Sequence, residues 1–292
     1  MHRDRDHHRT SDLGRWKSGL PLLRSNLLEE EGLMNNRKWI WLFSAVMILA
    51  LGGCSKKEEP SATEAGKEAA TAPPPIDPAT VGEVTGKVLF EGTKPQPQRI
   101  VMDDDPACLQ KHHGPVFAED GAVNDNGTLS SVFVYVKAGA EKYTIAPPVE
   151  PVTLDQDGCM YKPHVLGIMA GQTLRIVSSD DTTHNIHPIP RNNREWNMSQ
   201  PSGSPPIEQK FVRPEIMILA KCNNHAWMRA WIGVTSNLFF AVTGSDGTFT
   251  LKGLPPGDYT IEAWTATFGT QEQKVTVGAK ESKTVDFVFR AS

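Results

Sequence analysis

The chain has 292 residues, of which 39% are hydrophobic, and a formal net charge of −4 at pH 7. This hydrophobic content supports one large or two modest domains with cores of their own, and it excludes a chain that is disordered throughout. The slightly acidic balance gives no indication of nucleic acid as a partner.

The first 53 residues are predicted to be an N-terminal extension plus a lipoprotein signal peptide. The stretch "MNNRKWIWLFSAVMILALGGC" runs from Met34 to Cys54 and combines two basic residues with an apolar run of 13 residues. Such a run is too short for an ordinary transmembrane helix and is typical of a cleaved secretory signal. Its end, "LGGC", resembles the bacterial lipobox, which implies cleavage before Cys54 and lipid on its thiol. We expect translation to begin at Met34.

A lipid on Cys54 would anchor the mature chain on the periplasmic side of a bacterial membrane or at the cell surface. Ser55 follows, where aspartate retains enteric lipoproteins at the inner membrane, so the outer membrane is the favoured destination. Residues 54–81 are rich in Ala, Glu, Lys and Pro and have no apolar periodicity. They are predicted to form a disordered linker that tethers the folded part.

From residue 82 onward the chain consists of short apolar or alternating runs such as "SVFVYVK" and "HVLGIMAGQTLRIVSS". No stretch keeps a helical period for more than two turns, so the sequence predicts an all-β protein built from sandwiches or barrels. The turns "GSDG" and "PPGDY" favour antiparallel hairpins. The spacing of apolar runs and turn residues becomes more regular after "GVTS". This change predicts two domains, at 82–236 and 237–292.

The C-terminal motif "DGTFTLKGLPPGDYTIEA" resembles the carboxypeptidase regulatory-like, transthyretin-like β-sandwich. The resemblance covers roughly 50 residues, which is short for a complete sandwich. Two possibilities remain open. Strands from "VTGKVLFEGTKPQ", within residues 82–100, complete the sandwich, or the tail docks directly on the larger domain.

A possible metal site lies in "KCNNHAWM", where Cys222, His225 and Met228 occupy positions i, i+3 and i+6 after the apolar run "IMILA". A thiolate, an imidazole and a thioether suit copper better than calcium, magnesium or structural zinc. Such a site needs a further imidazole, and His184 follows the predicted strand "TLRIVSS". These four side chains are the predicted metal ligands.

The segments "HNIH" and "CNNHAWM" together resemble the amicyanin and plastocyanin branch of the cupredoxins, over residues from about 155 to 235. The resemblance implies a Greek-key β-sandwich and one type 1 copper site, with Asn185 joining the two ligand loops. It also implies that His225 meets solvent through an apolar patch, for which Trp227, Pro188 and Ile189 are the candidates. More broadly, the mature chain is similar to methylamine-utilisation-like bacterial proteins. Ala226 stands where relatives often have proline, which implies a less rigid loop.

The remaining cysteines and histidines are predicted to have structural roles. Cys108 and Cys159 are expected to form a disulfide, because free thiols seldom persist in exported proteins. His187 lies three residues along a strand from His184 and so points to the opposite face. The other histidines expected to be surface or structural residues are His112, His113 and His164.

The resemblance implies an electron carrier rather than an enzyme, with redox proteins such as a cytochrome or a dehydrogenase as partners. The sequence contains no G-x-S-x-G, P-loop, H-E-x-x-H or C-x-x-C-H motif. Two alternatives remain open. One is a lipoprotein that holds or delivers copper through the same ligands, and the other is a metal-free structural or adhesion β-sandwich lipoprotein.

Overall fold

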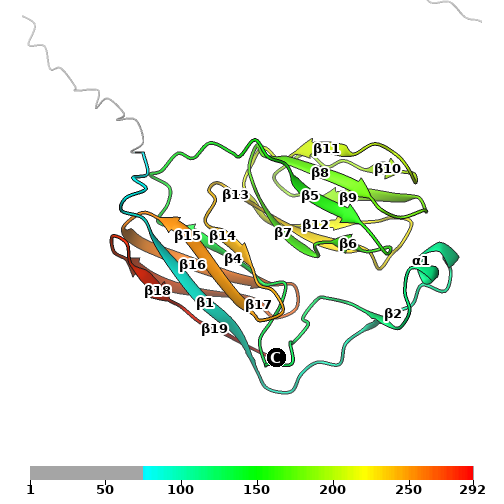
Figure 1. Cartoon of the computed structure of the whole chain (residues 1–292), viewed down its shortest axis with the longest axis horizontal. Helices are drawn as coiled ribbons and strands as arrows, with labels where there is room; N and C mark the ends of the chain where they lie inside the picture. Colours follow the sequence, from blue (N-terminus) through cyan, green and yellow to red (C-terminus); the bar gives the residue numbers. More distant parts are fainter. Residues whose placement is uncertain (1–74, 292) are drawn as a thin grey trace, which may run out of the picture. The chain divides into compact units, whose positions relative to one another are not determined.

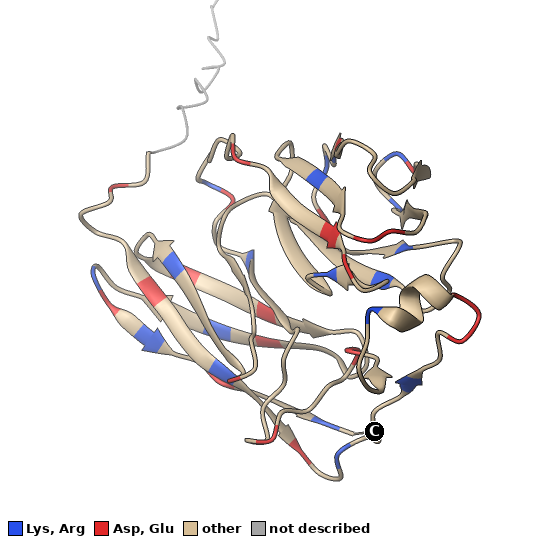
Figure 2. Cartoon of the chain, turned by 45° about the vertical axis from the view of Figure 1, so that its right-hand side comes forward, with Lys and Arg blue, Asp and Glu red and all other residues tan. Residues whose placement is uncertain are grey.

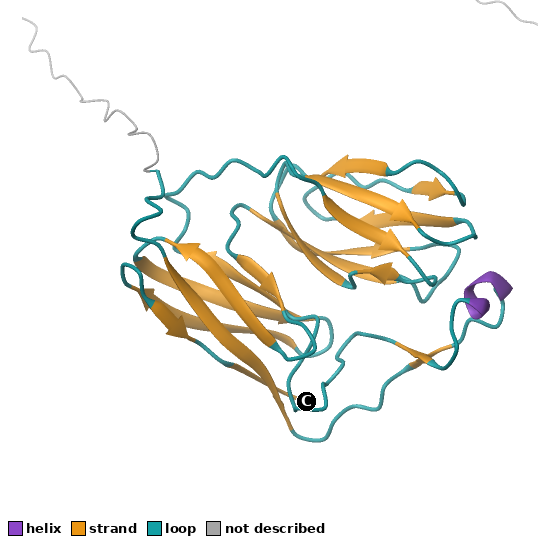
Figure 3. Cartoon of the chain, viewed as in Figure 1, coloured by secondary structure: helices purple, strands orange, loops and turns teal. Residues whose placement is uncertain are grey.

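The computed structural model describes residues 75–291 (Figure 1). The predicted signal peptide, Cys54 and most of the linker lie outside these residues. The described part consists of strands, loops and one short helix, α1 (Pro106–Gln110) (Figure 3). The all-β prediction is therefore confirmed. None of the helical structure in this part of the chain is long and apolar enough to cross a membrane.

The first sandwich is formed by the middle of the chain and consists of two facing sheets. The first sheet has the order β10 (Met198–Gln200), β9 (His184–Ile189), β12 (Glu215–Lys221), β13 (Arg229–Thr235), β7 (Val165–Met169). The second sheet has the order β11 (Ile207–Lys210), β8 (Thr173–Ser178), β5 (Val152–Gln156), β6 (Tyr161–Lys162). Alternate side chains point inward along a strand, so Leu174 and Ile176 of β8 meet Ile218 of β12 in one buried cluster.

The second sandwich combines strands from both ends of the described chain. Its first sheet has the order β15 (Thr248–Leu254), β1 (Gly82–Glu91), β18 (Ser282–Thr284), with β19 (Phe287–Arg290) also on β1. Its second sheet has the order β14 (Phe240–Val242), β4 (Phe133–Ala138), β16 (Gly257–Thr265), β17 (Gly269–Val277). Val84 and Val88 of β1 and Val134 of β4 are buried in the core of this sandwich.

This arrangement differs from the expected division at residue 236, because β1 and β4 belong to the second sandwich. Of the two possibilities for the C-terminal tail, the structure shows the one in which residues near 82–100 supply a strand. β1 pairs antiparallel with β15 and parallel with both β18 and β19. At Gly86 of β1, a Cβ atom would lie 1.8 Å from the carbonyl oxygen of Val285, so only glycine permits this approach.

A separate segment, residues 99–117, contains β2 (Arg99–Ile100), α1 and β3 (Val116–Phe117), and we call it the cap segment. Helix α1 starts where Asp105 caps its N-terminus and Pro106 occupies the first turn, both of which are favourable there. A disulfide between Cys108 in α1 and Cys159 in the turn before β6 ties the cap segment to the first sandwich.

Candidate metal centre

The predicted ligands lie at one end of the first sandwich, where β9 begins and β12 ends. β9 and β12 are hydrogen-bonded neighbours in antiparallel register, with Lys221 opposite His187. The loop after β12 is closed by two backbone hydrogen bonds, from Cys222 N to Met228 O at 3.1 Å and from Met228 N to His225 O at 2.9 Å. These bonds hold the loop residues over the start of β9.

Three of the predicted ligands converge through atoms that can bind a metal. His184 Nδ1 lies 2.9 Å from His225 Nδ1, and Cys222 Sγ lies 3.7 Å from the same His225 nitrogen. Two nitrogens that each bind one ion at about 2.0 Å lie about 3 Å apart, so the observed spacing fits a shared ion. All three side chains are buried, with relative exposures of 0% for His184, 3% for Cys222 and 5% for His225.

The other two predicted residues are placed beside these ligands. Met228 is fully buried in the same apolar cluster as Cys222. Asn185 Oδ1 accepts a hydrogen bond from the backbone N–H of Asn223 at 2.6 Å and lies 3.3 Å from Cys222 Sγ. Asn185 thus joins the start of β9 to the loop after β12, which is the role that the resemblance implies for it.

Asp180 orients His184 and was missed in the sequence analysis. Its Oδ2 lies 2.9 Å from His184 Nε2, so Nε2 carries a proton and Nδ1 is left to face the other ligands. Burial raises the pKa of Asp180, but hydrogen bonds from His184 and from the backbone of Cys159 and Gly158 outweigh it and lower the pKa to about 2. The sequence contained one signal for this role of Asp180, since it places a carboxylate four residues before a candidate ligand.

Asp105 makes the equivalent contact with the second imidazole. Its Oδ2 lies 2.8 Å from His225 Nε2. The hydrogen bond with His225 is the largest influence on Asp105 and lowers the pKa of its carboxyl. The expectation that His225 meets solvent is therefore wrong, because the cap segment covers this edge of the ring.

The expected apolar patch around His225 is also absent from the described residues. Trp227 packs against His225 with ring centroids 5.2 Å apart, and its Nε1–H donates to Cys159 O at 3.0 Å. Pro188 is buried, and only Ile189 of the three candidates is exposed.

The protonation of His184 opposes metal binding at neutral pH, because an ion must displace a proton from it, whereas the protonation of Cys222 favours binding. A hydrogen bond between two Nδ1 atoms requires one of them to carry a proton, and this proton lies where a metal ion would bind. Burial lowers the pKa of His184, but hydrogen bonds with Asp180 and Cys222 outweigh it and raise the pKa to about 9. Burial raises the pKa of Cys222, but hydrogen bonds involving His184, Asn185 and His225 lower it to about 6. Cys222 can therefore be a thiolate, the form that binds metals, at neutral pH.

Within residues 75–291, the remaining cysteines and histidines lie outside the group formed by His184, Cys222 and His225. Cys108 and Cys159 lie beside His225, but both sulfurs are used in the disulfide. His187 Nε2 bonds Glu195 at 2.6 Å, and His112 Nε2 bonds Gly158 O at 2.7 Å. His113 is exposed.

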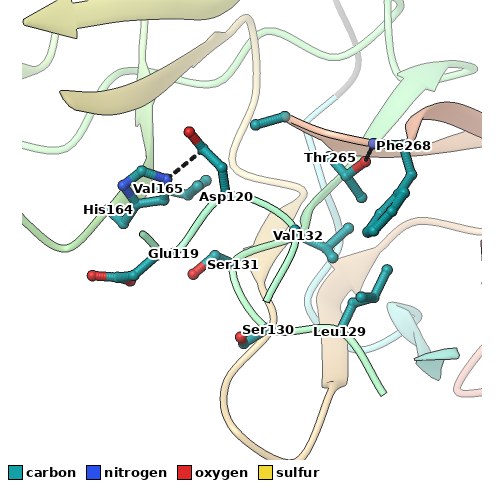
Figure 4. Close-up of a pocket in the computed structure, with 12 residues that line it drawn as sticks. Glu119, Asp120, Leu129, Ser130, Ser131, Val132, His164, Val165, Thr265 and Phe268 are labelled. Carbon is teal, nitrogen blue, oxygen red and sulfur yellow. Dashed lines mark hydrogen bonds and ion pairs between the residues drawn. The ribbon is translucent and has the colours of Figure 1, made fainter. Parts of the chain in front are cut away.

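His164 lies in a separate polar cluster beside a small pocket (Figure 4). Its Nε2 lies 2.7 Å from Asp120 Oδ1, and the same oxygen accepts a hydrogen bond from Trp231 Nε1 at 3.1 Å. Both ring nitrogens of His164 thus have partners within the fold, since Nδ1 lies 3.1 Å from Arg229 O, and this agrees with the structural role proposed for it.

One family model matches the C-terminal part of the chain. The model of the carboxypeptidase regulatory-like domain matches residues 233–290. The match includes β14 to β19 but neither β1 nor β4. No curated protein sequence matches the chain.

Similar solved structures include several copper proteins. A Cu-containing nitrite reductase from Thermus scotoductus SA-01 is 22% identical, with a TM-score of 0.28, over 34% of this chain and 27% of the reductase. The match thus spans about a quarter of that protein. A purple cupredoxin from Nitrosopumilus maritimus is 22% identical, with a TM-score of 0.25, over 28% of this chain and 98% of its own. The Cu(I) form of a mutant of amicyanin is 16% identical, with a TM-score of 0.26, over 35% of this chain and 98% of its own. The fold is all-β, with weak similarity to cupredoxins and a carboxypeptidase regulatory-like domain at residues 233–290.

Proposed function

We propose that the protein binds one copper ion through His184, Cys222, His225 and Met228 and carries single electrons between redox partners. The observation that supports this most strongly is the convergence of a buried thiol and two imidazole Nδ1 atoms, 2.9 Å apart. This donor set is soft and mixes sulfur with nitrogen, which favours copper over calcium or magnesium.

The residues around the ligands hold them in one geometry. Asp180 and Asp105 accept hydrogen bonds from the Nε2–H groups of the two imidazoles, so each ring turns its Nδ1 inward. Asn185 joins the two ligand loops through Asn223. Copper would supply the one-electron redox chemistry, and ligands fixed in this way need little rearrangement when its oxidation state changes.

A redox partner could approach from the side of Cys222. A surface depression of about 340 Å³ is lined by Leu219, Lys221, Cys222, Asn223, Ala226 and Arg229. Lys221 and Arg229 are exposed, so this side favours partners with an acidic surface, such as a cytochrome or a dehydrogenase. The proposed role is that of a carrier and not of an enzyme.

The proposed location follows from the N-terminal sequence. Lipid on Cys54 would hold the domains on the periplasmic side of a bacterial membrane or at the cell surface, with the outer membrane favoured by Ser55. Residues 54–81 would then separate the domains from the membrane.

Spectroelectrochemistry of the copper-loaded protein tests the proposal. A carrier should take up and release one electron per copper ion reversibly, and copper should stay bound when a Cu(I) chelator is added. Rapid transfer of copper to the chelator would instead indicate a delivery protein. Failure to bind copper at all would leave the metal-free structural role.

A further inference from the structure

The two carboxylates that contact the imidazoles are connected through the disulfide. Asp105 Oδ1 accepts hydrogen bonds from the backbone N–H groups of Ala107 at 2.9 Å and of Cys108 at 3.2 Å. Cys108 is bonded to Cys159, whose backbone N–H donates to Asp180 Oδ2 at 2.7 Å. A continuous chain of contacts therefore runs from His225 through Asp105, the disulfide and Asp180 to His184.

Asp105 is well placed to fix the orientation of His225. Each oxygen of its carboxylate has a separate task, since Oδ1 caps helix α1 and Oδ2 contacts His225 Nε2 at 2.8 Å. Thr182 Oγ1 also donates to Oδ2, at 3.5 Å. A carboxylate only accepts hydrogen bonds, so the proton on the ring must lie on Nε2. His225 Nδ1 is then the nitrogen that faces Cys222 and His184.

The geometry points to Asp105 as a positioning residue of the metal centre, held in place by the disulfide-bonded helix α1. The cap segment is accordingly part of the centre, and Asp105 sets which nitrogen of His225 is available to a metal. This inference rests on the proposed function in one respect, since it takes His225 as a ligand.

A capping role alone would not require the contact with His225. Aspartate and asparagine are both favoured N-cap residues, so Asp105→Asn keeps the cap and the size of the side chain. With the amide oxygen held by Ala107 and Cys108, the amide nitrogen of the variant faces His225 Nε2. An N–H donor at that place favours the proton on Nδ1, the nitrogen that must be free for a metal.

The matched control is Asp104→Asn. Three consecutive aspartates, Asp103 to Asp105, lead into α1, and Figure 2 shows this loop in red beside the helix. Asp104 is exposed, so its replacement removes the same charge from the same loop while His225 keeps its partner.

Two measurements are made on the full mature chain. The first is the ¹⁵N NMR spectrum of His225 in the metal-free protein, which reports whether Nε2 carries the proton. The second is the affinity for Cu(II), from competition with a chelator of known affinity. We expect the Nε2 proton in the wild type and in Asp104→Asn but its loss in Asp105→Asn. Loss of a residue that orients a ligand typically weakens metal binding by about 10- to 100-fold, and this is the effect expected for Asp105→Asn alone.

The outcomes separate this inference from the proposed function. Wild-type Cu(II) affinity and an unchanged His225 spectrum in Asp105→Asn would overturn it, as would an equal loss of affinity in Asp104→Asn. Suppose that the wild type binds no copper, but that His225 carries the Nε2 proton in the wild type and lacks it in Asp105→Asn. The proposed function then fails and the positioning role of Asp105 stands. The Cys108→Ser/Cys159→Ser protein should also bind Cu(II) more weakly, and adding Asp105→Asn to it should cost less than in the wild type.

Discussion

Met228 is the proposed ligand whose effect on redox properties can be separated from folding. Met228→Leu conserves side-chain volume in a fully buried position, so the cost in stability should stay below about 1.5 kcal/mol. The variant should still bind copper through the other three ligands, but its reduction potential should rise, because loss of the thioether would favour Cu(I). The midpoint potential is the measurement. An unchanged potential would mean that Met228 only packs in the core.

Sequence analysis could predict two of the three residues that converge in the centre, Cys222 and His225, because they share one short loop. Cys222, His225 and Met228 are brought together by local backbone hydrogen bonds. Asp180 could have been found, since it precedes His184 by four residues. Asp105 could not, because it lies 120 residues from His225 and reaches it only through the tertiary fold.

A buried carboxylate joins β12 to the loop that follows β9. Glu215 of β12 accepts hydrogen bonds from the backbone N–H groups of Arg191 at 2.5 Å and Asn192 at 2.9 Å, and from Asn193 Nδ2 at 3.0 Å. Burial raises the pKa of Glu215, but these hydrogen bonds outweigh it and hold the pKa below its ordinary value of 4.5. The charged form therefore stabilises the fold.

Glu215→Gln should destabilise the protein in a way that depends on pH. Hydrogen bonds to a charged group contribute about 1.5–3 kcal/mol, so the free energy of unfolding should fall by about this amount at pH 7. A folded pKa below the unfolded one gives stability that is present above about pH 4.5 and is lost as the pH falls through the folded pKa. Urea unfolding at pH 7 and pH 3 measures the difference between variant and wild type, which should shrink in acid. A difference that stays constant would contradict this role of Glu215.

The strands could be predicted from alternating apolar residues, but helix α1 could not. A helix of five residues is too short to show a periodic pattern, although Asp105 and Pro106 are favourable starting residues. Its position is set by the disulfide, which joins residues 51 apart in sequence.

At the scale of the whole molecule, the second sandwich depends on strands from distant parts of the sequence. The boundary at residue 236 was predicted from a change in the spacing of apolar runs and turn residues. Such spacing does not show which strands pair. β1 and β4 each lie between two neighbours in their sheets, and together they contribute several residues to the core. A family model starting at residue 233 leaves both of these strands out.

Residues 237–292 should therefore not fold on their own, whereas residues 75–292 should. Without β1 and β4, both sheets lose a strand from their middle and the apolar core is open to water. The ¹H–¹⁵N NMR spectrum of the short fragment should show the narrow dispersion of an unfolded chain. A well-dispersed spectrum of that fragment would show that the C-terminal part is an independent domain.

The central claim is that His184, Cys222 and His225 together form a copper site, and a titration of the metal-free protein with Cu(II) tests it most directly. The visible spectrum should develop an intense thiolate-to-copper charge-transfer band that saturates at one equivalent. In Cys222→Ala the band should be absent while the far-UV circular dichroism stays that of a folded β protein, because the thiolate supplies the transition. A wild-type protein that shows no such band, or a Cys222→Ala protein that keeps it, would contradict the proposed site.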